Sequence, residues 1–126
     1  MEARYRFSVR FRLSPTTVDV TVDPAEFETS LCHRAAPPGE DGWLFFRDHL
    51  WRGSVNDPAH FRALVSEALG VTVIDVDYRA LEADSAYLSS LREAIAADLS
   101  LFNADSVDAV LSNYLGSSIE RQPDEE

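Results

Sequence analysis

The sequence predicts an α+β domain, with a mostly antiparallel sheet of about five strands and three helices packed on one face. Two observations support this fold class. In the first half of the chain, apolar residues recur at every second position, which is typical of half-buried strands. In the second half, they recur at three- and four-residue spacing between capping residues and glycines, which is typical of helices. We expect one domain over residues 1–120.

The first two predicted strands lie at residues 3–13 and 18–23. In the first, the odd positions are apolar and the even positions are mostly arginine: Tyr5, Phe7, Val9, Phe11 and Leu13 against Arg4, Arg6, Ser8, Arg10 and Arg12. Residues 14–17 have turn composition. If Leu13 pairs with Val18 across this turn, Arg12 lies opposite Asp19, which cross-strand pairing favours.

Residues 27–35 predict a third strand, and residues 36–42 form a loop rich in proline and glycine. Residues 43–53 begin with a dense apolar run. We interpret this segment as a fourth strand, or as a strand that passes into a turn. A short helix is the alternative, because the apolar run has no clear period.

The first predicted helix begins at Asp57, the N-cap, and Pro58, the first helical residue. Apolar residues follow at helical spacing, and Gly70 ends the helix. Residues 71–78 are rich in β-branched side chains and predict the fifth strand.

The second predicted helix covers residues 85–101. Asn103 is expected to cap the third helix, which ends before Gly116. Residues 121–126 are polar and acidic and are expected to form a disordered tail.

The charge of the chain indicates a salty solvent. The 126 residues include 22 acidic and 11 basic side chains, for a net charge of −11, and every basic residue is an arginine. Such a charge repels itself in dilute buffer but is screened at molar salt. We therefore expect a cytoplasmic protein adapted to concentrated KCl, with no membrane segment, since no apolar run approaches about 20 residues.

The arginine face of the first strand has two interpretations. Arg4, Arg6, Arg10 and Arg12 together resemble a phosphate-binding stripe, which would suit a nucleic acid or nucleotide. The simpler interpretation is an ion-pair network with aspartates on neighbouring strands, at positions Asp19, Asp23, Asp75 and Asp77. Because the aromatic residues lie on the opposite face, no base-stacking platform accompanies the arginines. Nucleic-acid binding is therefore the alternative and not the leading hypothesis.

The cysteine and histidine residues predict no catalytic or metal site. Cys32 and His33 are adjacent in a strand and should point to opposite faces, so they do not pair. The sequence lacks the closely spaced cysteine and histidine pairs of zinc sites and the glycine-rich loops that bind phosphate. We expect no metal, no cofactor and no enzymatic activity, with His33, His49 or Cys32 as the candidates if a reaction were catalysed.

The segment of residues 43–53 is the strongest candidate for a binding surface. It combines tryptophan and arginine, which are enriched at interface hot spots: Trp43, Arg47, Trp51 and Arg52. The alternative is that both tryptophans belong to the core. The leading hypothesis is a non-enzymatic domain that binds a protein partner or associates with itself.

The same segment carries a family resemblance. Leu50, Trp51 and Arg52, within residues 42–53, together with residues 113–119, resemble the LWR-salt protein family of haloarchaea. The resemblance implies a halophilic protein without an assigned activity. It supplies no catalytic residues that could be carried over to this sequence.

Overall fold

The fold comes from a computed structural model that describes residues 1–13, 19–21, 23, 25–102 and 104–122. It is an α+β domain, which confirms the predicted class. One sheet has the strand order β2-β1-β5-β6, and a separate pair consists of β3 and β4. The strands are β1 Ala3–Arg12, β2 Glu26–Arg34, β3 Leu50–Trp51, β4 Ser54–Val55, β5 Thr72–Ala83 and β6 Ile119–Arg121. The helices are α1 Phe45–His49, α2 Pro58–Leu69, α3 Ser85–Ala97, the 3-10 helix η1 Leu99–Leu101 and α4 Val107–Leu115.

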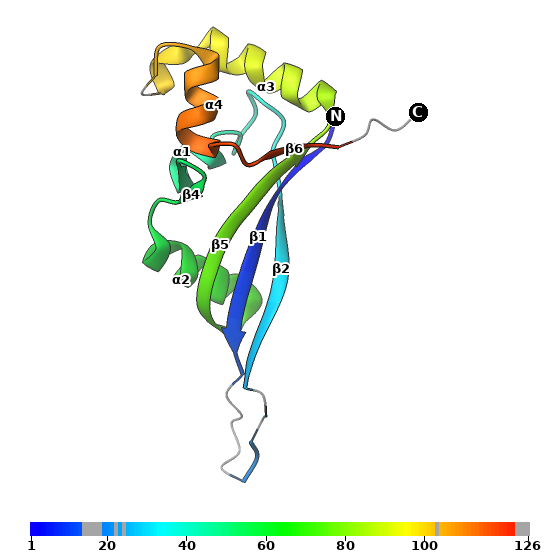
Figure 1. The fold of residues 1–126 in the computed structure, drawn as a ribbon, viewed down its shortest axis with the longest axis vertical. Helices are drawn as coiled ribbons and strands as arrows, with labels where there is room; N and C mark the ends of the chain where they lie inside the picture. Colours follow the sequence, from blue (N-terminus) through cyan, green and yellow to red (C-terminus); the bar gives the residue numbers. More distant parts are fainter. Residues whose placement is uncertain (14–18, 22, 24, 103, 123–126) are drawn as a thin grey trace.

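The helices lie on one side of the sheet, with α2 beside the lower part of β5 and α1, α3 and α4 towards the other end (Figure 1). Strand β1 is central, and its alternation is confirmed: Tyr5, Phe7 and Val9 are buried in the core beneath the helices. The arginines at even positions face away from this core. We call that side of the sheet the open face.

Strand β1 pairs with β2, and the described residues 19–21 and 23 are not part of a strand. The pairs include Phe11 with Phe27 and Arg12 with Glu26, so the expected pairing of Arg12 with Asp19 is wrong. Val18 lies outside the described residues. The observed register aligns nine residue pairs, stacks Phe11 on Phe27 at 5.7 Å, and places glutamates beside arginines. A short hairpin between β1 and residues 18–23 would lack these contacts.

The segment of residues 43–53 forms the short helix α1 followed by β3, so the preferred interpretation as a strand is wrong over most of its length. A helical turn brings Phe46 and Leu50, four residues apart, into the core together, and both are fully buried. In a strand, two neighbouring apolar residues such as Phe45 and Phe46 would have faced opposite sides of the sheet.

Helix α2 begins as predicted. The Asp57 carboxylate accepts a hydrogen bond from the His60 backbone N–H at 3.2 Å, and Pro58 is the first helical residue. Gly70 ends the helix with φ of 71°, a left-handed conformation that glycine adopts without strain.

The last two long helices differ from the prediction at one end each. Helix α3 stops at Ala97 and is followed by η1, so the predicted helix over 85–101 is interrupted. The N-cap of α4 is Ser106, whose hydroxyl accepts from the Ala109 N–H at 3.1 Å, whereas Asn103 lies outside the described residues.

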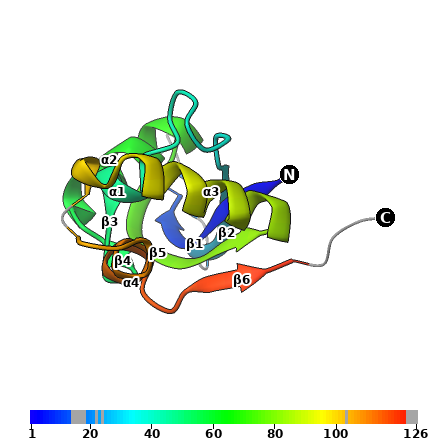
Figure 2. The same ribbon diagram turned by 90° about the horizontal axis from the view of Figure 1, so that it is seen from above.

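The chain after α4 returns to the sheet instead of leaving it at residue 121. Strand β6 runs parallel to β5 at the edge of the sheet (Figure 2), which makes the sheet mixed and not wholly antiparallel. Arg121 belongs to β6, and the Gln122 N–H donates to the Ala83 carbonyl at 2.8 Å. These two residues are therefore not part of a disordered tail, and residues 123–126 lie outside the described residues.

Within the described part of the chain, no helix has the length and apolar composition needed to cross a membrane.

Candidate functional site

The open face of the sheet carries an ion-pair network. Arg4 and Arg6 both donate to the Glu82 carboxylate, at 2.7 and 3.0 Å, and Arg6 also reaches Glu120 at 3.3 Å. Arg10 pairs with Asp75, and the Arg12 guanidinium lies 3.5 Å from Glu26. Each of the four arginines at the even positions of β1 therefore has a carboxylate beside it.

The carboxylates of this network differ from those expected. Asp75 is a partner as predicted, but the others are Glu26, Glu82 and Glu120, because β1 lies between β2 and β5 and because β6 joins the sheet beside β5. Glu82 is buried, with 8% of its surface exposed. The hydrogen bond from Arg4, supported by Arg6, holds the pKa of Glu82 below its ordinary value in spite of this burial.

The Leu-Trp-Arg tripeptide divides between the core and the surface. Leu50 is fully buried, whereas Trp51 is 38% exposed and Arg52 is exposed. The Trp51 ring meets Tyr114 edge to face at 5.3 Å, and the Arg52 guanidinium lies over the Trp51 ring at 5.7 Å. We call Trp51 and Arg52 the Trp51–Arg52 surface.

The backbone at Arg52 is held in an unusual conformation by α4. Arg52 has φ of 52°, and it is the one non-glycine residue with positive φ in the described part of the chain. Its N–H donates to the Asn113 carbonyl at 2.6 Å, and the Gly53 N–H donates to the Tyr114 carbonyl at 3.1 Å. A Cβ at Gly53 would approach the Leu115 carbonyl oxygen to 3.2 Å, so the two turns meet backbone to backbone.

The other two residues predicted to bind a partner lie in different surroundings. Trp43 is half-buried and packs edge-on against Phe46 and Phe102, at 6.3 and 6.0 Å. Arg47 pairs with its neighbour Asp48 at 3.0 Å. Trp43 therefore supports the core, and the exposed aromatic–cation pair is formed by Trp51 and Arg52.

Two histidines come together in a way that the sequence did not indicate. His33 stacks on Phe45 at 4.4 Å, and His49 meets the same ring at 4.7 Å. Partial desolvation lowers the pKa of both imidazoles; His49 lowers that of His33 further, whereas Asp48 partly offsets the lowering at His49. The only signal in the sequence was that His33 shares the odd positions of this strand with Phe27 and Leu31; its position opposite the buried Tyr5 places it on the helix side of β2.

Cys32 is separated from this histidine pair. It is exposed and lies opposite Arg6 on the open face, so Cys32 and His33 do lie on opposite faces of β2.

Acidic residues 40, 41 and 48 border a depression of about 460 Å³ beside the two histidines. Among the described residues, no group of three or more histidine, cysteine or carboxylate side chains is arranged to hold a metal ion.

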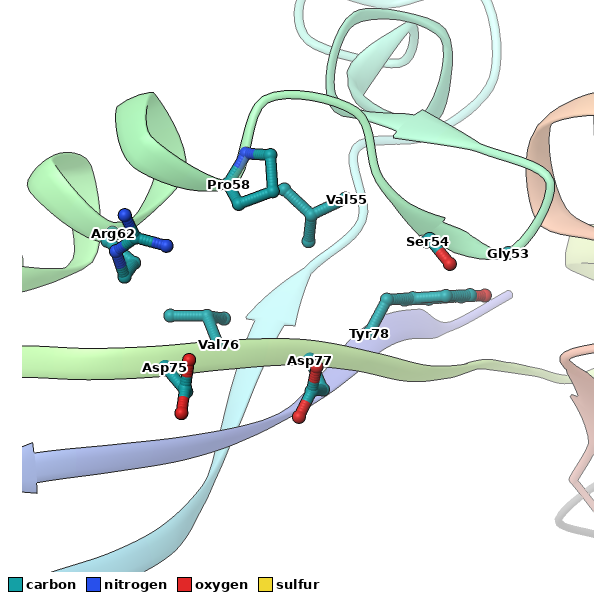
Figure 3. Close-up of a pocket in the computed structure, with 9 residues that line it drawn as sticks. All are labelled: Gly53, Ser54, Val55, Pro58, Arg62, Asp75, Val76, Asp77 and Tyr78. Atoms are coloured by element: carbon teal, nitrogen blue, oxygen red, sulfur yellow. The ribbon is translucent and has the colours of Figure 1, made fainter.

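A second hollow, of about 310 Å³, lies between β5 and the chain from β4 to α2 (Figure 3). Val76 and Tyr78 point into it, whereas the carboxylates of Asp75 and Asp77 point to the other side of β5 (Figure 3). Arg62 lines one end of the hollow, and the carboxylates of β5 do not converge with it as polar groups do in a catalytic pocket.

The histidine pair predicts a pH-dependent stability. The pKa values of His33 and His49 are lower in the folded chain than in the unfolded chain, where a histidine has a pKa of about 6.5. Below about pH 6.5 the unfolded chain therefore binds more protons than the folded chain. Their contribution to stability should therefore be complete above about pH 6.5 and fall as the pH drops towards the folded-state values. Urea unfolding at several pH values measures this effect.

The matched control for the pH experiment separates histidines from carboxylates. Replacing both His33 and His49 by glutamine should flatten the dependence between about pH 7 and 5.5. An unchanged slope in the double variant would show that other groups cause the effect.

The fold and these surfaces define a small acidic α+β domain with one charged, uncovered sheet face and an exposed tryptophan–arginine pair. The chain belongs to the LWR-salt protein family, whose model matches residues 1–125. The two segments that carried the resemblance, residues 42–53 and 113–119, contact each other in the structure, where Arg52 and Gly53 meet residues 113–116. Neither the comparison with curated proteins nor the comparison with solved structures gives a match.

Proposed function

We propose that this chain is a non-enzymatic binding module of a salty cytoplasm that holds a protein partner through the Trp51–Arg52 surface. The observation that carries this proposal is the backbone of Arg52. A left-handed conformation at a residue other than glycine is uncommon, costs energy, and clusters at functional sites. Here it places a guanidinium over an exposed tryptophan ring.

The chemistry of the surface suits a protein partner. Tryptophan and arginine supply large contact area and directional donors, and both are enriched at hot spots. No carboxylate of the described residues forms a salt bridge with Arg52, so its donors remain for a partner group. We infer a partner that offers a carboxylate beside an apolar patch.

Phosphate binding by Arg4, Arg6, Arg10 and Arg12 has less support. Each guanidinium already has a carboxylate at hand, which would repel a phosphate and would have to be displaced. Phosphate contacts also lose affinity steeply as salt rises. The ion-pair network of the open face is better explained as a contribution to the stability of an acidic protein.

The double variant Trp51→Ala/Arg52→Gly tests the proposed surface. Glycine relieves the positive φ of residue 52, so the variant should fold. Loss of two hot-spot side chains should weaken partner binding by about 30-fold or more. Immobilised protein is used to capture partners from an extract of the source cells at about 1 M KCl, where the Debye length is about 3 Å.

Arg79→Ala is the matched control, because Arg79 is another exposed arginine, on β5. The wild type and the control should capture a common partner that the double variant lacks. If all three capture the same proteins and have the same mass in solution, the proposed surface is not used. Circular dichroism at the same salt confirms that each variant is folded.

A further inference from the structure

Strand β2 leaves one edge of the sheet uncovered. It is the outermost strand on the side of β1 away from β5 (Figure 1). Its nine residues contain neither proline nor glycine, and its register with β1 shows no bulge. Proteins usually protect such edges with bulges, prolines or charged side chains, above all lysine, because a flat edge pairs readily with another strand. β2 has no bulge, proline or lysine, and its charged side chains Glu26, Glu28 and Arg34 are of both signs.

The ladder with β1 shows which backbone groups of β2 face outwards. The Ala35 N–H donates to Ala3, and the Leu13 N–H donates to Ala25, so the odd-numbered residues of this strand bond to β1. In an antiparallel ladder the residues between them direct their N–H and C=O groups away from that neighbour. These outward residues are all exposed: Glu26, Glu28, Ser30, Cys32 and Arg34.

We propose that a second copy of this chain pairs with β2 edge to edge, antiparallel, with Ser30 opposite Ser30 of the second copy. Ser30 is the midpoint of β2, so this register alone lets all five outward residues of each copy form backbone hydrogen bonds. The two sheets would join into one across a two-fold axis.

The charges of β2 favour the same register. It places Glu26 of each copy opposite Arg34 of the other, at both ends of the paired strands. Within its own chain, Arg34 lies opposite Arg4, and it forms no ion pair with any of the described residues. A carboxylate from the second copy would therefore compensate a cation that its own sheet leaves beside another cation.

The salt dependence of this pairing follows from the net charge. Two chains that each carry −11 repel one another in dilute buffer. At about 1 M salt the Debye length is about 3 Å, so the long-range repulsion is removed while directly opposed pairs still interact. An edge-to-edge contact is small, so the dimer should form in a concentration-dependent manner.

The first test measures mass by light scattering over a range of protein concentrations at about 1 M KCl. The wild type should shift from monomer to dimer. Ser30→Pro removes an outward N–H and leaves the bonds between β2 and β1 intact, so it should fold and remain a monomer. Ser30→Thr, which keeps the N–H, should dimerise like the wild type. A wild type that stays monomeric, or a proline variant that dimerises equally well, would overturn the proposal.

The second test reads the register and does not depend on the proline variant folding. With Cys32→Ser as background, Ser30→Cys should form an intermolecular disulfide, because opposed residues of this type have Cα atoms about 5.5 Å apart. Glu28→Cys on the same background should not, since its two copies would be about 13 Å apart along the strands. Equal crosslinking of both variants, or crosslinking of Glu28→Cys alone, would exclude this register.

The third test exchanges the charges. Arg34→Glu should weaken dimerisation by about tenfold, since it replaces two exposed ion pairs by like-charged pairs. Adding Glu26→Arg should restore part of the loss; because it also removes the carboxylate beside Arg12 of the same chain, circular dichroism checks that this variant is folded. If the single variant dimerises as well as the wild type, the proposed pairing of Glu26 with Arg34 is wrong.

Discussion

Replacing Phe46 by alanine should lower the free energy of unfolding by about 3–5 kcal/mol. Phe46 is fully buried and stacks on Phe102 with ring centroids 5.7 Å apart and planes 13° apart. It also makes T-shaped contacts with Trp43 and Tyr114, so one ring joins α1, the residue that follows η1, and α4. Alanine would leave a cavity among rings that cannot collapse easily.

The effect of this substitution should extend to the Trp51–Arg52 surface. Helix α1 has five residues, too few to be stable without tertiary contacts. It leads directly into β3, whose last residue is Trp51. Loosening of α1 should therefore reduce partner binding as well as stability.

Urea unfolding at about 1 M KCl measures the change, with Leu64→Ala as the control. Leu64 lies on α2 and is 40% exposed, so its truncation should change stability by less than about 1 kcal/mol. A loss below about 1 kcal/mol for Phe46→Ala would show that Phe46 is not an anchor of the core.

Local signals in the sequence predicted much of the fold. The alternation of β1 follows from the two-residue period of a strand, and the start of α2 follows from the capping chemistry of Asp57 and Pro58. Both signals depend on neighbours in the chain. For the same reason the α+β class could be predicted without knowing which strands pair.

The wrong predictions concern features set by distant residues. The partner of β1 was misassigned because residues 18–23 also alternate, and only the longer register with β2 explains the choice. Strand β6 has three residues and little apolar character, and its place is fixed by pairing with β5. The apolar run before Leu50 has no period that distinguishes a helix from a strand.

The candidate site could be predicted in composition but not in geometry. Trp51 and Arg52 stood out by residue type, but the left-handed backbone of Arg52 depends on the Asn113 carbonyl, which is remote in sequence. The packing of Trp43 against the core depends in the same way on Phe102, which is also remote in sequence. The pairing of the arginines with Glu82 and Glu120 required the strand order of the sheet.

Removing salt should unfold the protein, and restoring molar KCl should refold it. The domain has a radius of gyration of about 14 Å. At about 0.01 M salt the Debye length is about 30 Å, so every carboxylate repels every other. At about 1 M it is about 3 Å, and only groups in direct contact still interact.

Salt also weakens the attractive ion pairs of the open face, but this loss is smaller than the gain from screening the self-repulsion. Contact pairs such as Arg4 with Glu82 at 2.7 Å lie within even the shortest Debye length, so salt weakens them little. Each exposed pair contributes about 0–1 kcal/mol. The repulsion of 11 uncompensated charges extends over the whole domain and is the part that salt removes. Stability should therefore rise steeply with KCl.

Circular dichroism during dilution from about 2 M to about 0.01 M KCl measures the transition, and re-addition of salt tests its reversibility. The informative variant neutralises exposed carboxylates that form no ion pair among the described residues: Glu67→Gln, Glu93→Gln and Asp105→Asn. With three fewer negative charges and the arginine network intact, it should stay folded at lower salt than the wild type. A melting temperature that is constant from about 0.1 M KCl upwards, where the Debye length is already about 10 Å, would mean that self-repulsion does not limit stability and that the acidity serves binding instead.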